Sequence, residues 1–180
     1  VDEFSQLNLD YRIAIVAFGD LTVPGDRIEA TNFITNIEII KKSLKRIPRY
    51  GGGGNEGESS LEALLKAIKL EYRSTAVKVI ILITDEPAIQ RELTATTLIE
   101  TLTKNEFLTF VISPAIQYFK DMAIKNGGKW YQISATTDFS DLLDMFKEVA
   151  KKVTVVVRDV YKIGNGKVST YLQLKDPSKD

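Results

Sequence analysis

The chain has 180 residues and equal numbers of basic and acidic side chains, 24 of each, so its formal net charge is zero. This length suggests one domain, or one domain with a small appendage. A neutral chain gives no sign of the broad basic surface that binds nucleic acid, and no apolar run approaches the roughly 20 residues that span a bilayer.

The sequence contains neither Cys nor His. It therefore has no disulfide, no thiolate nucleophile and none of the commonest transition-metal ligand. Any bound metal would need oxygen ligands, which favours Mg²⁺, Mn²⁺ or Ca²⁺ over Zn²⁺.

Apolar runs alternate with helical patterns along the chain, which indicates an α/β fold with a mostly parallel sheet. Residues 12–18 form a short apolar run typical of a buried strand. Residues 36–47 and 58–72 carry apolar side chains at helical spacing, on either side of a glycine run. Residues 77–83 are the most β-rich run of the sequence, so we predict a central strand there.

The second half continues this alternation, with predicted helices at 94–104 and 117–125 and predicted strands at 107–113 and 130–133. A further helix is predicted at 138–152, with Asp138 or Thr137 as its N-cap.

The C-terminal tail has a different pattern, because two β-rich runs, 153–160 and 167–174, flank Gly164-Asn165-Gly166. We predict a β-hairpin for this tail. The expected division is an α/β domain at 1–152 and a β extension, or a rearranged strand, at 153–180.

Acidic residues follow two of the predicted strands directly. Asp85 and Glu86 come after residues 77–83, at the end of a strand where open α/β sheets bind ligands. On position alone, Asp85 is equally well explained as a cap of the following loop. Asp20 follows the first predicted strand and would emerge at the same edge of a parallel sheet, although a lone Asp there is more often a turn residue.

A glycine-rich loop at 51–57 leads into the helix predicted at 58–72. Such loops can bind phosphate through backbone amides, but the phosphate-binding pattern needs a Lys followed by Ser or Thr, which is absent. Acidic side chains in a first helical turn are favourable in any case, so a capped helix explains this segment structurally. The remaining interpretation is that Asn55 and Glu58 present oxygen atoms to a cation.

The order of these segments resembles the von Willebrand factor A domain. The resemblance rests on the strand at 11–20, the glycine-rich loop with its helix, and Ile-Leu-Ile-Thr-Asp-Glu-Pro-Ala at 81–88. Three later segments at 107–114, 123–133 and 138–143 follow in the same order, so it covers about residues 1–152. It implies a doubly wound, mostly parallel sheet with helices on both faces, in a non-catalytic domain that binds a protein ligand through a divalent cation.

In this family, three loops supply oxygen ligands to the cation. Asp85 matches the third-loop Asp, Glu58 falls on the metal-binding Glu of the integrin β-subunit second loop, and Asn55 falls near the Asp of an adjacent site. The resemblance therefore implies Mg²⁺, Mn²⁺ or Ca²⁺ at these residues. The loops that would contact the protein ligand include three further residues, Asp20, Gly54 and Glu86.

The family's first-loop motif, Asp-x-Ser-x-Ser, ends a strand in the middle of the sheet, and we expect that strand and motif upstream of Val1. An empty position there would leave long unpaired strand edges. We expect it to be filled by a segment outside this sequence or by residues 153–160 as a rearranged strand, which would place Asp159 near the missing Asp.

Two other functions remain open. One is a structural domain of a larger assembly whose cation site has decayed. The other is a nucleotide-binding α/β enzyme that uses the glycine loop, for which no nucleophile, base or phosphate-binding Lys is suitably placed. The leading expectation is an interaction domain without catalysis, and an extracellular or cell-surface location is favoured by the family resemblance alone.

Overall fold

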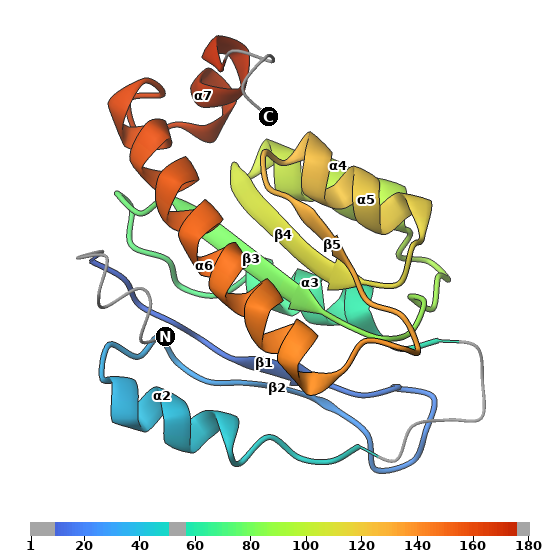
Figure 1. The fold of residues 1–180 in the computed structure, drawn as a ribbon. Coiled ribbons are helices and arrows are strands. Elements are labelled where there is room, and N and C mark those ends of the chain that lie inside the picture. Colours follow the sequence, from blue (N-terminus) through green and yellow to red (C-terminus); the bar gives the residue numbers. More distant parts are fainter. Residues whose placement is uncertain (1–9, 51–56, 176–180) are drawn as a thin grey trace.

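The computed structural model describes residues 10–50 and 57–175, and within these ranges the fold is α/β (Figure 1). The strands are β1 (Val16–Phe18), β2 (Ile28–Ala30), β3 (Lys78–Ile83), β4 (Phe107–Ser113) and β5 (Trp130–Gln132). The helices are α2 (Ile37–Leu44), α3 (Ser60–Ile68), α4 (Ala95–Lys104), α5 (Gln117–Lys125), α6 (Phe139–Lys162) and α7 (Val168–Leu174). None of these helices is long and apolar enough to cross a membrane.

The described strands form two sheets. β3, β4 and β5 make a parallel sheet in that order, with β4 in the middle, whereas β1 and β2 make an antiparallel pair. Helices α4 and α5 connect the parallel strands, as parallel pairing requires a long crossover. The predicted parallel sheet is therefore confirmed for these three strands.

Helices cover both faces of the parallel sheet (Figure 1). On one face, α3, α4 and α5 bury a cluster that includes Leu61, Leu98 and Phe119. On the other face, α6 and α7 pack through Val156 and Tyr171 against the opposite side chains of β4. Every residue of β4 is buried, because side chains on alternate positions enter the two clusters.

The prediction that residues 77–83 form the central strand is wrong in its position, although the strand itself is confirmed. β3 lies at the edge of the described parallel sheet, and Ile81 and Ile83 are 38% and 47% exposed. A run that is apolar on both faces indicates helices on both sides of a strand, but it does not specify the neighbouring strands.

The first predicted strand is confirmed only in its last three residues, as β1. Its partner β2 runs antiparallel and was not predicted, because Ile-Glu-Ala is too short and polar to give a strand pattern. This antiparallel pair also departs from an all-parallel arrangement of the N-terminal part.

The predicted C-terminal β-hairpin is wrong, because residues 153–160 continue α6 and residues 168–174 form α7. The buried residues of the first run are spaced as on one face of a helix. They are Val153, Val156, Val157 and Val160. Burial of this stripe against the sheet outweighs the preference of valine for strands, which depends strongly on context.

The same finding overturns the rearranged strand at 153–160, since a helix cannot occupy a strand position. The expected boundary at residue 152 falls within α6. The turn at Asn165 and Gly166, with φ of 50° and 80°, joins α6 to α7 and does not close a hairpin. At the other end of α6, the predicted cap is confirmed, because Asp138 Oδ1 accepts from the Asp141 N–H at 2.9 Å.

Candidate functional site

The loops that carry the candidate residues meet beyond the carboxyl ends of β1 and β3. Ser59, the N-cap residue of α3, is hydrogen-bonded to the loop after β1. Its N–H donates to the Gly19 carbonyl at 3.4 Å, and its Oγ accepts from the Leu21 N–H at 3.0 Å. The start of α3 is therefore attached to the loop that contains Asp20.

The residue before Ser59 is attached to the loop after β3. The Glu58 N–H donates to the Pro87 carbonyl at 2.9 Å, and the Ile89 N–H donates to the Glu58 carbonyl at 2.9 Å. Glu58 and Ala88 thereby form an isolated parallel bridge. The segment at 57–60 lies between the other two loops and joins them into one surface.

Gly57 permits the close approach of these loops. It has φ of +147°, and a Cβ at this position would lie 2.8 Å from the Pro87 carbonyl oxygen. A side chain here would push the two loops apart, and the backbone conformation also favours glycine. The sequence does contain this signal, since Gly57 stands directly before Glu58.

Asp20 is fully buried and its observed hydrogen bonds organise its own loop. Its Oδ1 accepts from the Thr22 N–H at 2.8 Å and its Oδ2 accepts from the Thr22 hydroxyl at 2.7 Å. The Asp20 N–H donates to Asp26 Oδ2 at 3.1 Å. These contacts agree with a turn residue, the simpler of the two interpretations from the sequence.

Thr84 links the loop after β3 to Glu58, although sequence reasoning did not identify it. It is buried, and its Oγ1 lies 3.5 Å from Glu58 Oε2 and 3.1 Å from the Glu86 carbonyl. The same oxygen accepts from the Glu86 N–H at 3.3 Å, which fixes the turn. Asp85 and Glu86 project from this turn as exposed side chains.

Tyr118 of α5 anchors the far end of this loop and was also missed. Its hydroxyl accepts from the Ala88 N–H at 2.7 Å. The ring of Tyr118 belongs to a helix whose pattern predicts only core packing, so nothing in the sequence marks its hydroxyl as a support of the loop.

The electrostatics of this surface centre on Glu58. Burial raises the pKa of its carboxyl above the ordinary 4.5, and the negative charges of Asp85 and Glu86 raise it further. Asp20 adds a smaller effect in the same direction, whereas the hydrogen bond from Thr84 lowers the pKa. Glu58 therefore lies close enough to carboxylates of both other loops to be repelled by them.

This arrangement suits a cation only in part. Two carboxylates, Glu58 and Asp85, lie within electrostatic reach, and Mg²⁺ is often bound by one or two carboxylates with several waters. Across residues 10–50 and 57–175, however, no three acidic side chains converge in a way that could hold a metal ion. Asn55 and Gly54, the other candidates, lie outside the described residues.

The protein-family models and the curated proteins that were compared with this chain give no match.

Replacing Glu58 by Gln is expected to stabilise the protein at pH 7 and to have no such effect at pH 4. Below its ordinary pKa of 4.5 the carboxyl is protonated in both the folded and unfolded states. As pH rises from this value through the raised folded-state pKa, the folded protein must ionise a group that burial and repulsion disfavour, so stability is lost. The expected gain is below about 1 kcal/mol, because solvent screens a half-exposed group.

Urea unfolding of the wild type and the Glu58→Gln variant at pH 4, 5, 6 and 7 measures this difference. Glu71→Gln, at an exposed position away from the three loops, is the matched control. A Glu58→Gln effect that is the same at all four pH values would contradict the proposed repulsion.

Proposed function

We propose that this chain is a non-catalytic interaction domain of the von Willebrand factor A type, which binds a protein ligand through the loops beyond β1 and β3. The observation that carries this proposal is the hydrogen bonding of three distant segments, 19–21, 57–60 and 84–89, into one surface. A parallel sheet with helices on both faces supports the doubly wound arrangement that the proposal requires.

The position of this surface favours a binding role. In open α/β sheets, ligands bind outside the carboxyl ends of the strands, and the candidate loops follow the carboxyl ends of β1 and β3. The loops also combine a supported backbone with exposed acidic side chains at Asp85 and Glu86. Such a supported polar surface suits recognition of charged and polar groups of a partner.

The proposal includes a divalent cation held by Glu58 and Asp85, with Mg²⁺ favoured and Mn²⁺ or Ca²⁺ as alternatives. The raised pKa of Glu58 supports this part, because a cation would relieve the repulsion among Glu58, Asp85 and Glu86. When bound, the ion would supply positive charge and an open coordination position for an acidic group of the partner.

A structural domain without a cation is the second candidate. It is favoured by the absence, among the described residues, of a third acidic side chain placed to complete a metal site. In that case the same three loops would serve only as a scaffold for neighbouring parts of an assembly.

Isothermal titration with Mn²⁺, Mg²⁺ and Ca²⁺ separates the two candidates. With so few protein ligands, we expect a Kd of about 10⁻⁴ to 10⁻³ M for the tightest ion. Asp85→Asn and Glu58→Gln should each weaken it about tenfold or more, because each removes one of two charged ligands. Asp144→Asn, an exposed substitution on α6, is the control. No binding heat in the wild type would leave the structural domain as the better account.

The protein ligand is tested separately from the cation. Any partner isolated on the immobilised chain should bind the purified wild type and should lose about tenfold in affinity or more with Glu86→Lys, because the change reverses a charge on the proposed surface. Glu71→Lys makes the same change elsewhere and should leave the affinity unaltered. Equal losses with both variants would contradict a binding surface at these loops.

A further inference from the structure

Helix α2 and the turn after it carry a dense basic segment that the candidate site does not use. Five basic side chains and one acidic side chain lie between Glu38 and Arg49, although the whole chain is neutral. The basic residues are Lys41, Lys42, Lys45, Arg46 and Arg49. A run of this kind is usually the solvated face of a helix, so its surroundings in the fold decide whether it has a further role.

Most of the positive charge of this segment is not neutralised by the fold. Glu38 Oε1 lies 3.5 Å from Lys41 Nζ, so the acidic side chain is beside that lysine. Among residues 10–50 and 57–175, no acidic side chain forms an ion pair with the other four basic residues. These four, which are all exposed, are Lys42, Lys45, Arg46 and Arg49. Unpaired exposed charges of one sign attract a surface of the opposite sign.

Three apolar side chains of the same segment are exposed as well. Ile39, Leu44 and Ile47 are 52%, 45% and 42% exposed. Leu44 follows Ile40 by about one helical turn, so both lie on one side of the helix, but only Ile40 is buried. The Ile47 N–H donates to the Leu44 carbonyl at 3.3 Å, which holds these two residues in one turn. The side of α2 that is buried at Ile40 therefore continues toward Ile47 without cover.

Basic and apolar side chains share the exposed surface of this segment. Lys42 comes three positions after Ile39, and Arg46 comes four after Lys42, so the three project from one side of the helix. In the last turn, Leu44 and Ile47 flank the two basic residues between them. A partner that covers this surface must therefore offer both negative charge and an apolar environment.

The helix is already formed without a partner. Asn36 is its N-cap, and its Oδ1 accepts from the N–H groups of Glu38 and Ile39 at 3.0 and 3.1 Å. At the other end, the Lys45 N–H donates to the Lys41 carbonyl at 3.2 Å. Binding through this segment therefore avoids the cost of ordering it, which a free basic peptide has to meet.

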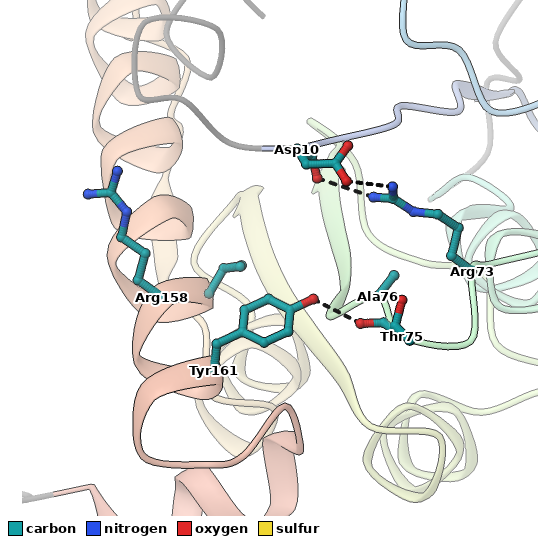
Figure 2. Close-up of a pocket in the computed structure, with 7 residues that line it drawn as sticks. Asp10, Arg73, Thr75, Ala76, Arg158 and Tyr161 are labelled. Atoms are coloured by element: carbon teal, nitrogen blue, oxygen red, sulfur yellow. Dashed lines mark hydrogen bonds and ion pairs between the residues drawn. The ribbon is translucent and has the colours of Figure 1, made fainter.

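α2 lies at the periphery of the molecule, beside the β1–β2 pair and away from α4, α5 and α7 (Figure 1). The cavity drawn in Figure 2, of about 300 Å³, is lined by Asp10, by residues 73–76 and by α6, so α2 takes no part in it. The positive charge of that cavity is balanced in part, since Arg73 Nη1 lies 2.8 Å from Asp10 Oδ2. The exposed groups of α2 belong to the outer surface, which suits an extended partner better than a small molecule.

We propose that the segment at 39–49 docks the protein on an anionic lipid bilayer. Its basic side chains lie at the level of the anionic headgroups, and Ile39, Leu44 and Ile47 enter the boundary between the headgroups and the acyl chains. A basic helix with exposed aliphatic side chains is typical of segments that bind a membrane surface. Nucleic acid would engage the basic side chains but leave the apolar ones in water, so it fits this segment less well.

Sedimentation of the full chain with large phospholipid vesicles tests this docking. The vesicles contain phosphatidylcholine with about 30% phosphatidylserine, in about 0.1 M salt. EDTA is present, so that no divalent cation can link the acidic loops to the lipid. We expect binding at least about tenfold tighter than to vesicles of phosphatidylcholine alone, and a loss of about tenfold or more in about 0.5 M salt.

Lys45→Glu combined with Arg46→Glu should weaken vesicle binding about 100-fold or more, because each basic side chain near an anionic membrane strengthens binding about fivefold. Lys125→Glu combined with Lys151→Glu makes the same change of net charge at exposed positions on α5 and α6. This control should alter binding by less than about threefold. The comparison separates docking through α2 from a general effect of net charge.

Leu44→Ser combined with Ile47→Ser should weaken vesicle binding about tenfold, because it removes the apolar groups that enter the bilayer. Ile39→Ser serves if the double variant does not fold. The chain has no Cys, so Leu44→Cys provides a single site for a fluorescent label. Lipid with brominated acyl chains should quench this label, whereas the same label on a Lys125→Cys variant should not be quenched.

Three results would overturn the docking. One is the absence of tighter binding to vesicles that contain phosphatidylserine. Another is an equal loss in the two charge-reversal variants. The last is a label at residue 44 that is not quenched on the bound protein, and tighter binding to a DNA duplex would then assign the basic segment to nucleic acid. None of these outcomes depends on the proposed cation or protein ligand, because EDTA is present and the vesicles contain no protein.

Discussion

Replacing Gly128 by Ala is expected to destabilise the fold by about 3 kcal/mol, at the upper end of the range for overpacking. A Cβ at Gly128 would lie 2.0 Å from the Thr109 carbonyl oxygen and 3.2 Å from the Phe110 nitrogen. These atoms belong to the backbone of β4, the middle strand, and cannot move without disturbing its pairing on both sides. Urea unfolding should show the full loss, and thermal unfolding a fall of about 10 °C for a chain of this size.

Gly25→Ala is the matched control for this substitution. Gly25 has φ of +97°, and no atom lies within 4 Å of the place that a Cβ would occupy, so its replacement carries backbone strain without a collision. We expect a loss of about 1 kcal/mol there. Equal losses at the two positions would mean that the close approach of Gly128 to β4 does not limit stability.

The parts of the fold that the sequence predicts well are those specified by local patterns. β4 and α5 have the predicted bounds, 107–113 and 117–125, because an apolar run and a helical pattern are each closed by clear breakers. α4 begins after Thr94, whose hydroxyl accepts from the Thr97 N–H at 3.2 Å as an N-cap. These signals act within a few residues and need no knowledge of the rest of the chain.

The errors arise where packing between distant segments decides the outcome. Residues 153–160 contain five valines, which favours a strand locally, but four of these valines are buried on one helical face that the sheet covers. Similarly, β3 has the composition of a central strand while β4 occupies that position. Local composition reports how much of a segment is buried, and it does not identify the segment that covers it.

In the candidate site too, some features could be predicted from the sequence, and others depend on contacts between distant segments. The family resemblance implies that Glu58 and Asp85 lie close together, and the negative charge of Asp85 does raise the pKa of Glu58. The supporting contacts could not be predicted, because Ser59, Thr84 and Tyr118 act through hydrogen bonds to backbone groups in other loops. Hydroxyl groups of this kind are common throughout a sequence, and only the folded chain selects those that hold a site in place.

Truncating Phe110 to Ala should destabilise the protein by about 4 kcal/mol, whereas Ile83→Ala should remove less than about 1 kcal/mol. Phe110 is fully buried in the middle strand beneath α6, so its loss leaves a cavity that the closely packed surroundings cannot fill. Ile83 is 47% exposed on β3, at the edge of the described parallel sheet, and loses few contacts on truncation.

Urea unfolding of the wild type and the two variants measures these losses in the free energy of unfolding. A large loss for Ile83→Ala would mean that this side chain is covered in the folded protein, and would contradict the position of β3 at the edge of the described parallel sheet. The loss for Phe110→Ala should be the larger of the two, since β4 has a neighbouring strand on each side and helices cover both of its faces.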